Sequence, residues 1–261
     1  MRTLVILWAE VRRTLRVARS YWLEYVADFA LYVTGFLLLL MVLSAASDRF
    51  GVEEQASSLI GYVTWIICAT VMEAVVGTVA AEARTGTLEQ VFLSASRPGT
   101  VLLARTAGFF VDYGLRGLLM GFVIAAVLGI LRPIPLLAVP LFVLTAAGAC
   151  GLGFGLAGLT LVYNRVEGLA NPLWQALVFF SGALAPPIRP VLVLVSRVLP
   201  IGWGIAALRA VVLDGASVTT LWQRGLLPGL LLNTMIYVTL GALAFAWGQK
   251  KARAQGTLAH Y

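Results

Sequence analysis

Four charged side chains interrupt long apolar stretches of this sequence: Glu73, Arg105, Asp112 and Arg116. Charged groups are costly inside a bilayer and usually face the interior of a helix bundle or a wet cavity. Counted at about 1.5 Å per residue, Glu73 and Arg105 lie roughly 12 Å and 6 Å from the common end of two antiparallel helices, so they could form an ion pair. Asp112 and Arg116 would pair along one helix, as residues one turn apart do. The four groups could hold helices together or line a path for a substrate.

Groups for bond-making chemistry are scarce. The only histidine, His260, is next to the last residue, and the two cysteines, Cys68 and Cys150, lie in apolar stretches where packing is their expected role. A phosphate-binding G-x-x-x-x-G-K-S/T motif is absent, and the only lysines are Lys250 and Lys251. The chain therefore cannot bind ATP through a P-loop. We expect no catalytic residue, no metal site and no cofactor in this chain.

The elements that must position these groups are membrane helices. The 261 residues have a mean hydropathy of +0.92, with 60% hydrophobic and 12% charged residues, whereas about a quarter of a soluble domain is charged. A span needs about 20 apolar residues. Six stretches supply them: 29–47, 55–72, 106–131, 133–164, 168–188 and 225–249. The sequence therefore predicts an all-α integral membrane protein, with six transmembrane helices in a single domain over residues 1–261.

Basic residues are distributed unequally between the two sides of the predicted spans. With the N-terminus inside, the inner segments hold eleven lysines and arginines and the outer segments hold six, four of them in one long loop. Because inner loops carry the excess of basic residues, both termini are expected to be cytoplasmic. The formal net charge of +7 mostly reflects this asymmetry. The basic residues form no single patch, so a nucleic acid is not expected as a partner.

Residues 1–20 precede the first span and are predicted to form an interfacial helix. Their apolar side chains recur at helical spacing, at Leu4, Trp8, Val11 and Leu15. Such a helix places its apolar side in lipid and its arginines among phosphates. A simple basic anchor is the alternative. Glu24 and Asp28, near the start of the first span, could pair with these arginines.

Glycines recur within the stretches 101–130 and 136–161. They are Gly114, Gly117, Gly121, Gly148, Gly151, Gly153, Gly155 and Gly158. Small residues about four apart let helix backbones approach closely in a membrane. These glycines therefore predict close helix contacts rather than a nucleotide-binding loop.

Between the last two predicted spans, residues 186–225 resemble neither a span nor a polar loop. Two apolar stretches, 190–199 and 202–213, are separated by Pro200. Each is too short to cross a bilayer and too apolar for a solvated loop. A pair of re-entrant or interfacial helices on the outer side fits best, because irregular backbone at membrane depth has to be shielded by protein.

A polar segment, 82–97, separates the second and third predicted spans. Gly86 can end one helix and Thr87 can cap the next, with Gln90 placed as in a capping box. The pattern fits a short amphipathic helix over Leu88–Leu93. An ordinary solvated loop is the alternative.

The start of this segment reads E-A-R-T-G-T-L-E-Q-V-F-L-S-A-S and resembles the stretch E-x-x-x-G-T-L-E-x-L-x-x-S/T-P in permease subunits of type-2 ABC exporters. Residues 180–187, F-S-G-A-L-A-P-P, and residues 198–209, V-L-P-I-G-W-G-I-A-A-L-R, are similar to a second signature of that family. Ala95 departs from the pattern by replacing the usual proline, and Gly202-Trp203 replaces Thr-Tyr. The resemblance extends over essentially the whole chain.

The resemblance implies a permease without an ATPase site of its own. Two permeases, identical or sister subunits, would form a dimer in the cell membrane, driven by two cytoplasmic P-loop ATPases that bind ATP and Mg²⁺. They would move an amphipathic or lipid-linked compound outward. In that family the segment corresponding to 82–97 contains a coupling helix that docks onto the ATPase. Its contact residues in this chain would be Glu82, Arg84, Gly86, Thr87, Leu88 and Glu89.

Two other functions stay open. A membrane subunit of another transporter type, such as an importer permease, also receives coupling helices, although the paired half-helices fit it poorly. A membrane-embedded enzyme that modifies lipid head groups would need more acidic or histidine side chains than the sequence has. The cargo stays open too, because drug, lipid, haem-related and polysaccharide exporters share this plan.

Overall fold

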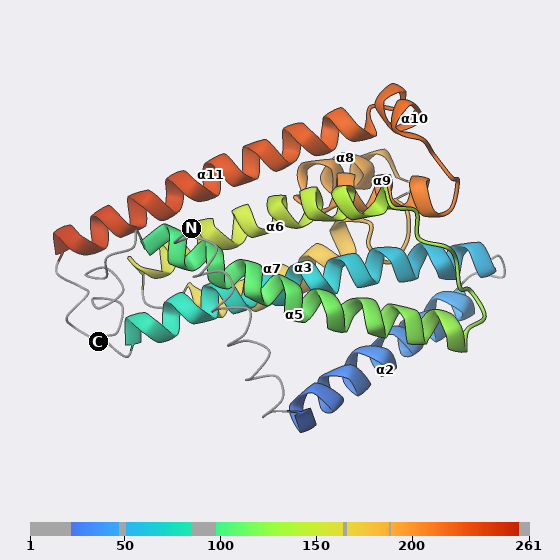
Figure 1. Cartoon of the computed structure of the whole chain (residues 1–261), viewed down its shortest axis with the longest axis horizontal. Coiled ribbons are helices and arrows are strands. Elements are labelled where there is room, and N and C mark those ends of the chain that lie inside the picture. Colours follow the sequence, from blue (N-terminus) through green and yellow to red (C-terminus); the bar gives the residue numbers. More distant parts are fainter. Residues whose placement is uncertain (1–21, 47–50, 85–97, 164–165, 188, 256–261) are drawn as a thin grey trace.

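The computed structural model describes residues 22–46, 51–84, 98–163, 166–187 and 189–255. Within these ranges the ordered elements are all helices, without a β-strand (Figure 1), which confirms the predicted all-α class. The predicted interfacial helix lies outside the described residues, and so does most of the polar segment that follows the second predicted span.

Five of the described helices are long and apolar enough to cross a membrane. They are α2 (Trp22–Ala46), α3 (Val52–Arg84), α5 (Pro98–Val127), α6 (Ala138–Thr160) and α11 (Leu226–Gln255). In Figure 1, α11 and α2 form opposite edges of the helix bundle. The chain is therefore a multi-pass membrane protein.

The predicted span 168–188 is a shorter helix than expected. α7 (Glu167–Phe180) has 14 residues, about 21 Å of helix against a hydrocarbon core of about 30 Å. Gly182 has a φ of +77°, a left-handed conformation that ends a helix, and Pro186-Pro187 cannot extend it. In place of six span-length helices the described residues contain five, or six spans if the bent pair α8–α9 crosses as one.

Residues 190–212 fold as the two half-length helices that were predicted, and their outer, re-entrant placement stays a prediction. α8 (Pro190–Val198) and α9 (Gly202–Val212) meet at a bend of 104°. Pro190 begins α8, where the missing N–H has no helical partner to lose. A further short helix, α10 (Val218–Gln223), follows, and the Ser217 hydroxyl caps it by accepting a hydrogen bond from the Thr220 N–H at 3.3 Å.

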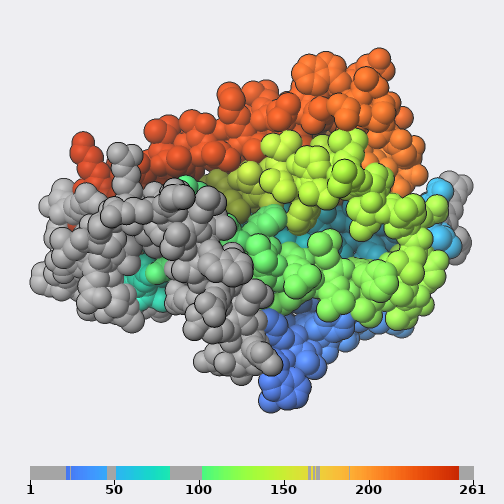
Figure 2. Space-filling model, viewed as in Figure 1, coloured from blue at the N-terminus to red at the C-terminus, as the bar shows by residue number. Residues whose placement is uncertain are grey.

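α3 is the central helix of the bundle. Inside the protein, 72% of its span is buried, against 11% of the α2 span. α3 contacts α5, α6, α7 and α9, and its side chains Ile67, Val71 and Met72 are almost fully buried. α2 packs lightly against α3 and α5, and it stands out at the edge of the molecular surface in Figure 2. The bundle therefore combines a tight centre with a loosely attached first span.

Glycines on both helices bring α6 and α11 into close contact. A Cβ atom on Gly241 would lie 1.9 Å from the Gly151 carbonyl oxygen, and one on Gly248 would lie 2.1 Å from the Gly158 oxygen. No side chain fits at such a distance, so the backbones touch. The predicted packing role of Gly151 and Gly158 is confirmed, with glycines of α11 as their partners.

In the contact between α3 and α5, glycines lie against side chains of the neighbouring helix and not against its backbone. At Gly117 and Gly121 the space for a Cβ is filled by the side chains of Ile67 and Val63. Gly114 differs, because a Cβ there would meet no atom within 4 Å. The first two glycines therefore serve helix packing, whereas Gly114 has no such contact within the described residues.

Replacing Gly241 by alanine is expected to separate α6 from α11, because the obstructing atoms are backbone and cannot rotate away. The free energy of unfolding should fall by roughly 1–3 kcal/mol, measured by thermal or denaturant unfolding of the purified protein in detergent. Gly114→Ala is the matched control, since its Cβ has free space. Equal stability of the two variants would contradict the contact.

Candidate functional site

Asp112 and Arg116 form the ion pair that the sequence predicted. Arg116 Nε donates to Asp112 Oδ1 at 3.1 Å, and Arg116 Nη2 donates to Asp112 Oδ2. The two residues are one turn apart on α5, so the helix itself sets this two-point geometry. Asp112 is only 7% exposed. The carboxylate therefore neutralises the guanidinium inside the bundle.

Tyrosines from two helices cover this pair. The centre of the Arg116 guanidinium lies 3.1 Å from the ring centroid of Tyr25 on α2 and 4.9 Å from that of Tyr113 on α5. The Tyr25 hydroxyl also donates a long hydrogen bond, 3.4 Å, to Asp112 Oδ2. A cation over an aromatic face gains electrostatic stabilisation, more so where water is excluded. The stack therefore links α2, which has few other contacts, to α5.

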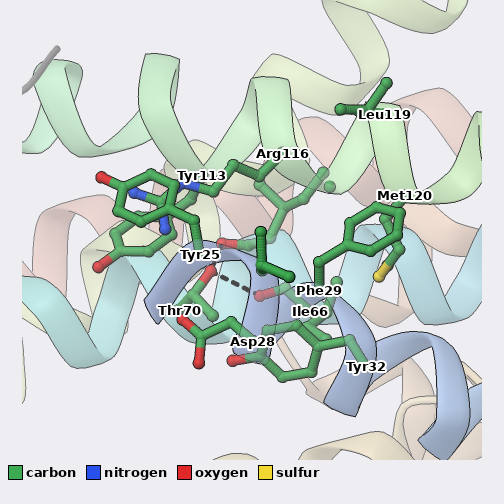
Figure 3. A pocket seen from close by; sticks show the side chains of 13 residues that line it. Tyr25, Asp28, Phe29, Tyr32, Ile66, Thr70, Tyr113, Arg116, Leu119 and Met120 are labelled. Atoms are coloured by element: carbon green, nitrogen blue, oxygen red, sulfur yellow. Dashed lines mark hydrogen bonds between the residues drawn. The ribbon is translucent and has the colours of Figure 1, made fainter. Parts of the chain in front are cut away.

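A cavity of about 330 Å³ lies beside the pair, between α2, α3 and α5. Figure 3 shows side chains of the three helices converging on it. α2 contributes Tyr25, Val26, Asp28, Phe29 and Tyr32; α3 contributes Ile66, Ile67 and Thr70; α5 contributes Tyr113, Arg116, Gly117, Leu119 and Met120. Within the described residues the lining is mostly aromatic and aliphatic, with one carboxylate and one guanidinium.

Arg105 pairs with Glu82 and not with Glu73. Arg105 Nη1 donates to Glu82 Oε1 across the contact between α3 and α5, and both side chains are mostly buried. Glu73 is exposed and lies about 13 Å farther along α3. The predicted Glu73–Arg105 pair is therefore wrong. Because α3 stays helical as far as Arg84, Glu82 is the carboxylate that reaches Arg105.

Arg209 on α9 is a buried charge that binds backbone. Its guanidinium donates hydrogen bonds to the carbonyl oxygens of Ser57 at 2.9 Å, Gly182 at 2.7 Å and Ala183 at 2.8 Å. A Cβ on Gly61 would lie 2.0 Å from the Ala183 oxygen and 2.7 Å from the guanidinium, so this approach requires glycine. Arg209 thus fastens α9 to the start of α3 and to the end of α7.

The residues predicted to contact an ATPase lie at the end of α3 and beyond it. Glu82 is held in the ion pair with Arg105. Arg84 is the last residue of α3, and its side chain is outside the described part. The other four, Gly86, Thr87, Leu88 and Glu89, lie in 85–97, outside the described residues. Their role stays a prediction.

A family model described as ABC-2 type transporter matches residues 1–213. The chain belongs to the ABC-2 transporter family. A comparison with curated proteins gave no match. The chain is therefore a transmembrane subunit of an ABC transporter, and the family implies partnership with an ATPase subunit. The matched residues include α2 to α9 and the cavity between α2, α3 and α5.

Sequence reasoning did not identify the tyrosine cluster of this ABC-2 subunit. A signal was present, because Tyr25, Asp28 and Tyr32 recur at a spacing that places them on one helical face. Tyr113 and Arg116 share a face of α5 in the same way. Only the packing of α2 against α5 shows that the two faces meet, and an isolated tyrosine in a membrane helix is otherwise unremarkable.

Asp112→Asn should destabilise the subunit, because it leaves the Arg116 guanidinium in the bundle without its carboxylate. Breaking one partner of such a pair costs about 3–5 kcal/mol when it is fully buried, and the half-buried Arg116 places the expected loss near the lower end. The double variant D112N/R116Q should recover most of that loss, since no charge remains. A double-mutant cycle of unfolding free energies measures this coupling. Additive effects of the two changes would contradict it.

Arg209→Met should have a larger effect than removal of an exposed arginine. It removes three hydrogen bonds between a buried guanidinium and backbone carbonyl oxygens, and an unfolding free energy lower by roughly 3 kcal/mol or more is expected. Arg224→Met is the control, because Arg224 forms an exposed ion pair with Asp214 at 3.2 Å and should cost less than about 1 kcal/mol. Similar unfolding temperatures for both variants would refute this anchoring role.

Proposed function

We propose that this subunit is the permease of an ATP-driven exporter, and that a separate ATPase drives it through the segment 82–97. The observation that carries the proposal is the family match over residues 1–213, which includes this segment. The partner ATPase binds ATP and Mg²⁺, because this chain has no P-loop. Both termini and the segment face the cytoplasm, as the distribution of basic residues indicates.

The helices that flank the segment support a mechanical role. α3 leads into it and α5 leads out of it, and the Glu82–Arg105 pair ties these two helices near the segment. α3 is the most buried of the five long helices and contacts most of the described bundle. A displacement of the segment by an ATPase therefore moves a packed helix pair as a unit, since packed interiors transmit strain rather than absorb it.

A second permease completes the transport path in this proposal. α2 buries only 11% of its span within the subunit, and its side chains Leu38, Met41 and Val42 are exposed. In a membrane such apolar surface is covered by lipid or by another helix. A substrate that moves along surfaces of this kind is amphipathic or lipid-linked. The helices α8 and α9 form the outer, re-entrant end of the path.

The double variant L88A/E89A should uncouple ATP hydrolysis from export. The assembled transporter should still form and hydrolyse ATP. Transport per ATP hydrolysed should fall by at least about tenfold, because a segment 82–97 that no longer follows the ATPase passes no free energy to the permease. Substrate efflux and phosphate release are measured together in proteoliposomes.

A matched control is L136A/D214A, which changes a leucine and an acid that are exposed in loops at the opposite end of the bundle. This variant should keep normal coupling. Normal export by L88A/E89A would remove the proposed role of the segment, and equal uncoupling by both variants would show a general defect in folding or assembly.

A further inference from the structure

The cavity between α2, α3 and α5 has the dimensions of a small-molecule site. Its volume of about 330 Å³ falls within the range of roughly 300–1,000 Å³ that ligand pockets occupy. Such pockets combine apolar walls with a few polar groups that fix the ligand's orientation. Here the apolar walls include Ile66, Ile67 and Met120, and the polar groups include Asp28 and Thr70.

The charge that faces the cavity is negative. Among the described residues of the lining Arg116 is the only basic one, and its guanidinium is already bound by Asp112 and covered by Tyr25. Asp28 also lines the cavity, and within the described part of the chain no ion pair neutralises it. Glu73 is exposed one turn beyond Thr70 on α3, so its carboxylate lies near the same cavity.

Neighbouring side chains experience this imbalance. Among the described residues, Arg116, Asp112, Asp28 and Glu73 lie near enough for their charges to act on the Tyr113 hydroxyl. One guanidinium is therefore set against three carboxylates. An anion entering the cavity would find Arg116 occupied and two carboxylates without an ion-pair partner among the described residues, whereas a cation would relieve the excess of negative charge.

The aromatic walls favour the same sign of charge. Tyr25, Tyr32 and Tyr113 line the cavity from two helices, and the face of an aromatic ring attracts cations through its quadrupole. Tyr25 and Tyr113 already hold Arg116 in this way. Tyr32, near Asp28 on the same face of α2, has no such cation among the described residues.

We propose that this cavity binds an amphipathic organic cation as the compound that the transporter moves, a step that rests on the proposed export function. The positive group, an ammonium or a phosphonium, lies against the Asp28 carboxylate and the Tyr32 ring. The apolar body packs against Ile66, Ile67 and Met120. Because α2 is lightly packed, it can move aside to admit the ligand from the membrane or the cytoplasm.

Tetraphenylphosphonium and tetraphenylborate test the proposal, because they share one shape and carry opposite charges. Binding is measured by isothermal titration calorimetry of the full chain in dodecyl maltoside, a neutral detergent, with empty micelles as the blank. We expect tetraphenylphosphonium to bind with one ligand per chain, at least about tenfold more tightly than tetraphenylborate, as cation–π and carboxylate contacts add together. Equal affinities for the two ions would overturn the proposal.

Variants assign the binding to the cavity. Asp28→Asn keeps the shape of the side chain and should weaken tetraphenylphosphonium binding at least about tenfold, while Asp28→Glu should retain it. Glu53→Gln is the matched control, because Glu53 is an exposed acid in the first turn of α3, far from the cavity lining. Helical content by circular dichroism and a monodisperse elution confirm folding. Wild-type affinity in Asp28→Asn would overturn the site.

A competition measurement distinguishes the proposed cation from a lipid head group. A short-chain phosphatidylglycerol, whose head group carries a phosphate and no cation, should leave tetraphenylphosphonium bound, because its phosphate is repelled by the carboxylates; displacement would assign the cavity to a lipid head group and overturn the proposed substrate class. The binding measurement uses no ATPase, so it is independent of coupling. Charge-selective binding would therefore stand even if L88A/E89A exported normally, and its absence would leave the export function itself untouched.

Discussion

A charged group inside an apolar helix bundle has to find its partner within the protein, because lipid offers none. Three mostly buried arginines among the described residues meet that requirement differently. Arg116 is neutralised by a carboxylate one turn away, Arg105 reaches a carboxylate on the neighbouring helix, and Arg209 binds three backbone carbonyls. Each of these arginines is bound or covered by a residue of another element, so each also helps to fix how two helices lie against each other.

The packing of the bundle is uneven, and this has mechanical consequences. Backbone contact at Gly151 and Gly241 joins α6 to α11, and α3 packs against five other described helices. α2 is held by the stack of Tyr25 on Arg116, by a hydrogen bond from the Tyr62 hydroxyl of α3 to the Tyr32 carbonyl oxygen, and by a few apolar contacts. The cavity lies at the boundary between the tight part and the loose helix, so any displacement of α2 changes its width.

The family match identifies the type of protein, and the structure adds information on the chemistry of a bound compound. The match to the ABC-2 type transporter model establishes a membrane subunit that works with an ATPase. It leaves the transported compound open. The cavity adds chemical information, because Asp28, Tyr32 and the paired Arg116 present an acidic and aromatic surface. The polar segment and the cavity are both reached through α3, which leads into the first and lines the second.

Composition and hydropathy alone determined that this protein is all-α and crosses a membrane repeatedly, because a span needs a long uncharged run. Local spacing also predicted the Asp112–Arg116 pair and the two half-length helices around Pro200, since partners or breaks there lie within a few residues. Only the tertiary structure decided that Arg105 meets Glu82, that α7 ends at Phe180, and that Tyr25 of α2 covers Arg116. These outcomes depend on helix register and backbone torsion, which are set by packing between segments distant in sequence.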